Sequence, residues 1–147
     1  IAAGPLNAKD VEWVDAAFRS GVGVQLEPVV QRELDVALHG WLARDGSLTR
    51  GVPTRLTIDA SGRWVETTRA EMGALSADET LQLTHTLEQT GRALHAAGYF
   101  GPFGIDAFRW RAPTGAVHFR PRCEINARYS MGWAVGLEGF RPAPGLY

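Results

Sequence analysis

The stretch Gly98–Gly132, GYFGPFGIDAFRWRAPTGAVHFRPRCEINARYSMG, predicts two strands joined by a turn. The first strand is expected from about Phe103 to Arg111 and the second from about Val117 to Asn126. Pro113-Thr114-Gly115 between them is typical of a turn, because proline fixes φ and glycine tolerates a positive φ. The stretch therefore predicts an antiparallel hairpin.

Side chains alternate between the two faces of a strand, so the second strand is expected to have an apolar face and a polar face. The apolar face would hold Cys123, which we expect to be a buried small apolar residue, together with Val117, Phe119 and Ile125. The polar face would carry His118, Arg120, Arg122, Glu124 and Asn126. This second face is too polar for a core and richer in charge than a solvated face requires.

The register of the hairpin decides which polar side chains of the two strands face each other. A three-residue loop at Thr114–Ala116 would place Asp106 opposite Glu124, and a two-residue loop would shift the pairing by one. Facing carboxylates repel, and a metal ion, an arginine or a shared proton normally compensates. Together with the amide of Asn126, they offer oxygen ligands that suit a hard cation such as magnesium. Arg128 follows within reach of an anion held by that metal.

Ordinary salt bridges on a solvated strand face explain the same charges without a metal. In that interpretation Asp106 would pair with Arg109 or Arg120, and Glu124 with Arg122 or Arg128. Spacing alone leaves both interpretations open.

Gly104-Ile105-Asp106, followed by Glu124-Ile125-Asn126-Ala127-Arg128, resembles the metal-binding end of the ATP-grasp family. The resemblance implies that Asp106, Glu124 and Asn126 hold magnesium, or manganese, at the phosphates of ATP. It implies that Arg128 is catalytic and contacts the phosphate or the reacting acyl group. The chain departs from the family in its lysines, because the single lysine, Lys9, is poorly placed to contact phosphates.

The segment EPVVQRE, Glu27–Glu33, resembles the hinge of ATP-grasp proteins. The resemblance implies adenine contacts from Glu27, Val29 and Val30 and a ribose contact from Glu33. The residues alone favour a short buried strand over 24–30 whose acids are solvated, although a proline at position 28 argues against a central strand. Both interpretations stay open.

The remaining chain predicts helices and further strands. Asn7 caps a helix over about 8–20, and Ser76 with Glu79 forms a capping box for a helix of about twenty residues that ends at Gly98. Strands are expected at 34–43, 48–58 and 64–67, with turns at Asp45-Gly46 and at positions 61–62, and Arg55 is the arginine of this region most suited to face a phosphate. The order predicts an α+β fold with a mostly antiparallel sheet covered by helices, like the C-terminal lobe of an ATP-grasp protein.

Composition limits the partners. The chain has 147 residues, a net charge of −1, one cysteine and 45% hydrophobic residues, which suits one domain with a real core. The charge does not favour binding to nucleic acid or to a membrane, and a single cysteine offers no disulfide framework, so we expect a cytoplasmic protein.

Two function classes follow from the resemblance. In the first, residues 1–147 are the C-terminal, ATP- and magnesium-binding part of a longer carboxylate–amine or carboxylate–thiol ligase that acts through an acyl phosphate. Its substrates would be a small-molecule carboxylate and an amine, and this part alone would be inactive. In the second, the chain is a non-catalytic ATP-grasp-like module for partner binding or regulation. A homodimer is one option for an oligomeric state that the sequence leaves open.

Overall fold

The computed structural model describes residues 6–25, 27–59 and 63–142, and the chain divides into two compact units, 1–31 and 32–147. The first unit contains α1 (Ala8–Arg19). The Asn7 side chain accepts a hydrogen bond from the backbone N–H of Asp10, and the Asp10 side chain accepts one from the N–H of Asn7. This reciprocal cap satisfies backbone donors that have no partner in the first turn, and it confirms the predicted helix and its start.

The strand predicted over 24–30 is wrong for the described residues of that interval, which have no regular secondary structure. Val29 has 68% of its surface exposed, so the apolar residues here do not form a core strand within the first unit. Pro28 gives a physical reason, since it cannot donate a hydrogen bond to a neighbouring strand.

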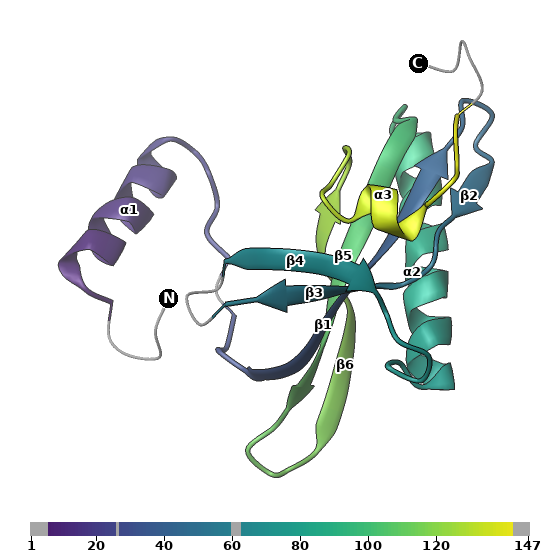
Figure 1. Ribbon diagram of the computed structural model, residues 1–147. Helices are drawn as coiled ribbons and strands as arrows, with labels where there is room; N and C mark the ends of the chain where they lie inside the picture. Colours follow the sequence, from purple (N-terminus) through teal and green to yellow (C-terminus); the bar gives the residue numbers. More distant parts are fainter. Residues whose placement is uncertain (1–5, 26, 60–62, 143–147) are drawn as a thin grey trace. The chain divides into compact units, whose positions relative to one another are not determined.

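The second unit is built on a mostly antiparallel sheet with the strand order β4-β3-β1-β5-β6, in which β2 also pairs with β1 (Figure 1). The strands are β1 (Gln31–Leu42), β2 (Leu48–Arg50), β3 (Thr54–Ile58), β4 (Trp64–Arg69), β5 (Gly101–Arg111) and β6 (Val117–Asn126). The α+β class expected from the sequence is therefore confirmed. The turn expected at positions 61–62 lies outside the described residues.

The single strand expected over 48–58 is instead two strands, β2 and β3, that pair with different parts of β1. The break includes Gly51 and Pro53. Pro53 has no N–H for a ladder, and a Cβ at Gly51 would lie 2.5 Å from the carbonyl oxygen of Gly136. A side chain at position 51 would therefore collide with the backbone of Gly136.

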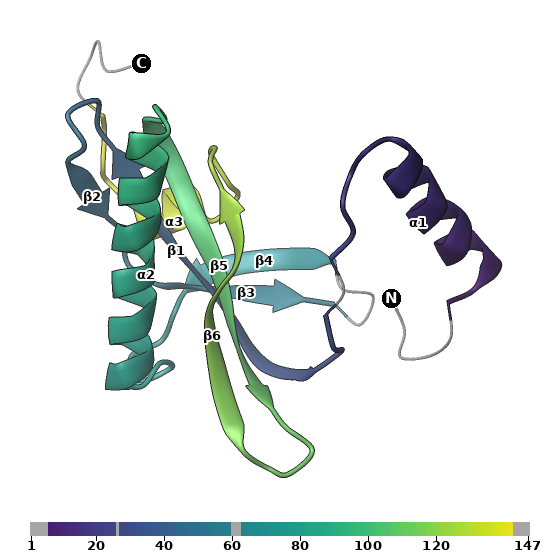
Figure 2. The same ribbon diagram turned by 180° about the vertical axis from the view of Figure 1, so that it is seen from behind.

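One face of the sheet is covered by α2 (Ala77–Ala96), which lies along it in both views (Figures 1 and 2). Ser76 and Glu79 form the predicted capping box at its start, and Gly98 after its end has a φ of 83°. Leu83 and Leu87 of α2 are fully buried among apolar residues of the sheet: Leu34, Val36, Leu38, Leu42, Phe103, Ile105 and Ala107. This cluster is the core of the second unit.

The opposite face is covered at one end by α3 (Trp133–Gly136). Trp133 and Leu137 pack on Trp41, and the indole Nε1 of Trp133 donates a hydrogen bond to the backbone oxygen of Gly40 at 3.2 Å.

No helix in the described part of the chain is long and apolar enough to cross a membrane.

Candidate functional site

The β5–β6 hairpin places Asp106 directly opposite Glu124, as the sequence predicted, but by a different route. A hydrogen bond from the N–H of Ala112 to the backbone oxygen of Ala116 closes a loop of three residues, 113–115, one position earlier than expected. Phe108 then pairs with Arg120, so four steps along β6 match two steps along β5 before Glu124 is reached. Pro121 lies in this irregular interval, where its missing N–H cannot join the ladder.

The three predicted metal ligands lie together on the face of the sheet away from α2. Asp106 stands between the buried residues Ile105 and Ala107, which face α2, so its own side chain points the other way. Directly opposite residues share a face, and so do residues two apart, which brings Glu124 and Asn126 to the same side.

The three side chains differ in solvent exposure: Asn126 is buried, Asp106 is half-buried and Glu124 is exposed. The Nδ2 of Asn126 donates to Oδ2 of Asp106 at 3.2 Å, which leaves the amide oxygen out of this bond. The pKa of Asp106 is raised to about 6, first by burial and then by the negative charge of Glu124, against the lowering effects of Asn126 and Arg128. A bound cation would favour the charged form of Asp106, because it would offset both the loss of solvation and the repulsion by Glu124.

Arg128 follows β6 and is exposed. Its positive charge lowers the pKa of Asp106, which places the guanidinium within electrostatic reach of that carboxyl. Its Nη1 donates to the backbone oxygen of the adjacent Tyr129 at 3.4 Å, a long and purely local contact.

Two of the four arginines that could pair with the acids of the site, Arg109 and Arg122, bond elsewhere. Arg109 donates to Glu79 at 2.7 and 2.5 Å and to the backbone of Ala74, on the α2 side of the sheet. The Nη1 of Arg122 lies 3.4 Å from Oγ1 of Thr90 on α2. Both arginines thus turn away from the face of Asp106.

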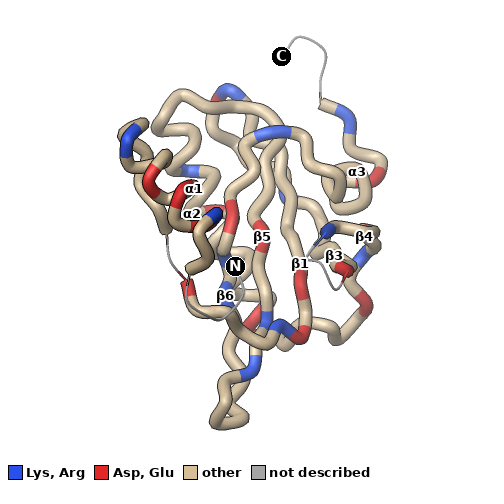
Figure 3. The backbone as a smooth tube through the Cα atoms, turned by 90° about the vertical axis from the view of Figure 1, so that its left-hand side faces the viewer, with Lys and Arg blue, Asp and Glu red and all other residues tan. Residues whose placement is uncertain are grey.

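Two residues of β1 that the sequence analysis did not single out extend the site. Asp35 raises the pKa of Asp106 by its charge and accepts a hydrogen bond from Nη1 of Arg32 at 2.9 Å. The guanidinium of Arg32 lies 4.1 Å from the ring centre of Phe108, which follows Asp106 by two residues on β5. Figure 3 shows acidic residues on β1 and β5, which are neighbours in the sheet. Alternation around Leu34 and Val36 could have revealed Asp35.

Glu33, the expected ribose contact, lies elsewhere. Its Oε1 accepts a hydrogen bond from Nε of Arg111 at 2.5 Å. It lines an open hollow of about 660 Å³ together with Ser76, Asp78, Glu79, Gln82, Arg109, Arg111, Val117, His118 and Phe119. That hollow lies beside the first turn of α2, and it contains none of the three predicted metal ligands.

The remaining expected nucleotide contacts belong to the first unit. Glu27 and Val29 are exposed and Val30 is half-buried, and Oε1 of Glu27 accepts a hydrogen bond from Nε2 of Gln25 at 2.5 Å.

Arg55, the expected phosphate-facing arginine, lies on β3 in the second unit. It pairs with Val36 and so shares the α2 face rather than the face of Asp106.

The apolar face predicted for β6 is only partly buried. Val117 and Ile125 are 48% and 44% exposed, and Cys123 is half-buried rather than buried. Its Sγ contacts the backbone oxygen of Asp106 at 3.3 Å. The irregular interval after Arg120 interrupts strict alternation, and β6 has a neighbour on one side only.

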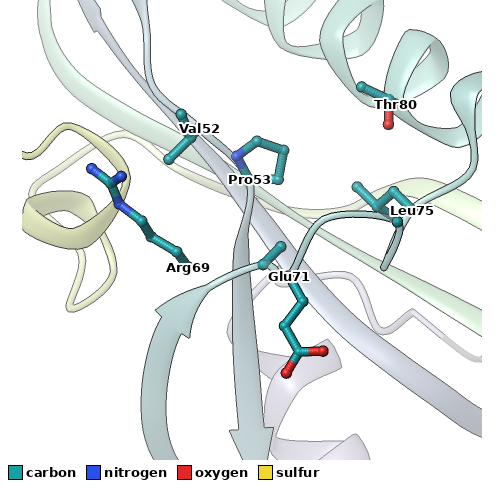
Figure 4. A pocket seen from close by; sticks show the side chains of 8 residues that line it. Val52, Pro53, Arg69, Glu71, Leu75 and Thr80 are labelled. Carbon is teal, nitrogen blue, oxygen red and sulfur yellow. The ribbon is translucent and has the colours of Figure 1, made fainter.

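A second hollow, of about 280 Å³, lies where β4 ends and the connection to α2 begins (Figure 4). Its walls are Val52, Pro53, Arg69, Ala70, Glu71, Gly73, Leu75 and Thr80. Arg69 turns toward the segment of α3, where it pairs with Glu138 at 2.8 Å. This hollow holds none of the predicted site residues.

The donor set of the site fits a magnesium ion better than a transition metal. It consists of two carboxylates and an amide, all of them hard oxygen ligands. Among the described residues no group of three or more His, Cys, Asp or Glu side chains is arranged to hold a metal. Asn126 and a nucleotide phosphate would therefore have to complete the ligand shell.

Solved structures that this chain resembles in fold include ATP-grasp enzymes. N5-carboxyaminoimidazole synthetase from Staphylococcus aureus matches with a TM-score of 0.51 and 13% identity, over 71% of this chain and 25% of that one. Pyruvate carboxylase from Rhizobium etli matches with a TM-score of 0.51 and 21% identity, over 85% of this chain and 10% of that one. The chain thus spans a quarter or less of these neighbours. Over most of its length the chain has the fold of part of an ATP-grasp enzyme, as the resemblance led us to expect.

At the level of sequence the comparisons give no relative. No protein-family model matches the chain. No curated protein matches it either.

Proposed function

We propose that this chain is the ATP- and magnesium-binding part of an ATP-dependent ligase that activates a carboxylate as an acyl phosphate and passes the acyl group to an amine or a thiol. The observation that carries the proposal is the facing pair Asp106 and Glu124, joined by Asn126, on the open face of the sheet. Two carboxylates are placed opposite each other at an electrostatic cost, which is reasonable where a cation is bound in the working state.

In this proposal Asp106, Glu124 and Asn126 hold magnesium at the phosphates of the nucleotide. Bound there, the ion would neutralise charge as the terminal phosphoryl group moves to the substrate carboxylate. Arg128 would steady the phosphate or the tetrahedral adduct formed when the amine attacks. Glu27, Val29 and Val30 would contact the adenine and Glu33 the ribose, which requires Glu33 to exchange its bond with Arg111 for the sugar hydroxyls.

The experiment is isothermal titration of the protein with ADP, with and without magnesium, alongside Glu124→Gln. We expect binding that needs magnesium and weakens about tenfold or more in the variant, because one charged ligand is lost. Glu66→Gln is the matched control, since it makes the same change at an exposed position on β4 and should leave binding unchanged. Equal binding by the wild type and Glu124→Gln would refute the metal-ligand assignment.

A non-catalytic module for partner binding or regulation is the second candidate. The departures of the chain from the family, above all the lack of phosphate lysines, favour it. Absence of any nucleotide binding by the full-length protein, with magnesium present, would support this second function over the first.

A further inference from the structure

A buried histidine on β1, His39, lies next to the candidate site. Only 2% of its surface is exposed, and burial lowers its pKa to about 4, so the ring is neutral at physiological pH. Within the part of the chain that the structure describes, its Nδ1 atom has no hydrogen-bond partner. A buried polar atom without a partner costs free energy, and an apolar side chain would avoid that cost.

Three glycines close around this ring. A Cβ on Gly104 would lie 2.7 Å from Cδ2 of His39, one on Gly132 would lie 2.8 Å from Cε1, and one on Gly136 would lie 3.1 Å from Nδ1. Carbon atoms do not approach so closely, so any side chain at Gly104 or Gly132 would displace the ring or the backbone. The imidazole thus fills a space shared by β5 and by the segment that includes α3.

The three glycines connect the two parts of the candidate site. Gly104 pairs with Asn126 and precedes Asp106 by two residues on the same face of β5. Gly132 follows Arg128 by four residues and opens α3. The ring of His39 is therefore wedged between the strand of the metal ligands and the segment that continues from the arginine.

We propose that His39 is a positioning residue, which seats the segment 129–136 on the sheet and thereby holds Arg128 beside Asp106. The consequence for Arg128 rests on the proposed function, whereas the seating of the segment does not.

Other contacts anchor the far end of this segment. The N–H of Val52 donates to the oxygen of Gly136 at 2.9 Å, and Trp133 reaches Gly40 through its indole. Arg128 comes before both of these contacts in the chain, by five residues for Trp133 and by eight for Gly136. His39 contacts the segment on both sides of Trp133, at Gly132, where Thr67 also lies close, and at Gly136, so it is well placed to fix where the segment begins.

The first test follows amide hydrogen exchange in His39→Leu, with Leu38→Ala as the matched control on the same strand. Leu38 is equally buried but belongs to the core under α2. In His39→Leu we expect exchange to rise about tenfold at Gly136 and Val52, whose amides bond within or onto the segment, while α2 stays protected. Leu38→Ala should instead raise exchange in α2 and in the strands of the core. A uniform rise across the sheet in His39→Leu, or no rise at Gly136, would overturn the proposal.

The second test asks whether the seating reaches Arg128. With magnesium present, the affinity for a non-hydrolysable ATP analogue is divided by the affinity for ADP, which isolates the contact with the terminal phosphate. Arg128→Ala should lower this ratio several-fold, and His39→Leu should lower it in the same direction. In the double variant His39→Leu should cause no further drop, because its effect acts through the arginine. General destabilisation of the fold would leave the ratio unchanged and lower only the unfolding midpoint.

The outcomes separate the two proposals. A wild-type protein that binds neither nucleotide refutes the proposed function, while hydrogen exchange still decides whether His39 seats the segment. A wild type that binds both nucleotides, with a ratio that Arg128→Ala lowers and His39→Leu does not, overturns the positioning role and leaves the proposed function standing.

Discussion

Asn126 on β6 donates a hydrogen bond from Nδ2 to Oδ2 of Asp106 on β5, at 3.2 Å across the hairpin. The bond favours the charged form of a carboxyl that burial and Glu124 push toward its neutral form. A single amide therefore partly offsets the electrostatic cost of the pair and is oriented by it. This arrangement makes the protonation of Asp106 the most informative property to measure.

Replacing Asp106 with asparagine should stabilise the protein near neutral pH. The folded-state pKa of about 6 lies above the ordinary value of 3.8 for an aspartate, so the folded protein binds the proton more tightly than the unfolded chain does. The favourable contribution of the protonated form is present below about pH 4 and is lost as pH rises through about 6. After allowance for solvent screening we expect Asp106→Asn to add about 1–2 kcal/mol at pH 7 and little at pH 4. Chemical denaturation at the two pH values measures this, and an equal effect at both would contradict it.

Removing the amide should move the same pKa further. In Asn126→Leu the bond that lowers the pKa of Asp106 is absent, while burial and the charge of Glu124 remain. We therefore expect the carboxyl to titrate above the wild-type value of about 6, as followed by carbon NMR of the side chain. A value that stays the same or falls would show that the hydrogen bond does not form in solution.

Glu79 links α2 to the sheet, because it caps the helix and also pairs with Arg109. Its pKa is lowered, with the hydrogen bond from Arg109 as the largest cause. The stability it contributes is present above the unfolded pKa of about 4.5 and is lost as pH falls through the lower folded value. Glu79→Ala should cost about 2–3 kcal/mol at pH 7. Asp78→Ala, in the same turn but exposed, should cost well under about 1 kcal/mol by the same denaturation measurement.

The core prediction compares two leucines of α2. Leu83 is fully buried and Leu81 is 67% exposed. Leu83→Ala should lower the unfolding free energy by about 2–5 kcal/mol, because it removes buried methyl groups and leaves a cavity beside the sheet. Leu81→Ala should change it by less than about 0.5 kcal/mol. Similar losses in both variants would mean that α2 is not packed as described.

The second unit was predictable where local signals decide the structure. The capping box at Ser76 and Glu79, and the glycine after the helix, specify the ends of α2 through bonds within a few residues. The hairpin strands β5 and β6 likewise follow from an alternating pattern on either side of a turn. The strand expected over 24–30 failed because apolar residues alone do not make a strand where no partner strand pairs with them.

The candidate site was predictable in its residue types but not in its surroundings. Asp106, Glu124 and Asn126 lie within one hairpin, so their meeting depends on a single local register. The loop of that hairpin was predicted one position too late, and the irregular interval around Pro121 restored the pairing. The error in the loop position and the unpredicted register shift cancelled, so the correct pairing of Asp106 with Glu124 does not mean that the hairpin register was predicted correctly.

The sequence by itself determined the two long helices, their caps and the hairpin, because these follow from contacts between residues close in the chain. Only the tertiary structure decided that Asp35 of β1 acts on Asp106, that Glu33 pairs with Arg111, and that three glycines close on the buried ring of His39. The physical reason is that β1 joins β5 through a long-range pairing, whose register depends on the whole core and not on any local pattern.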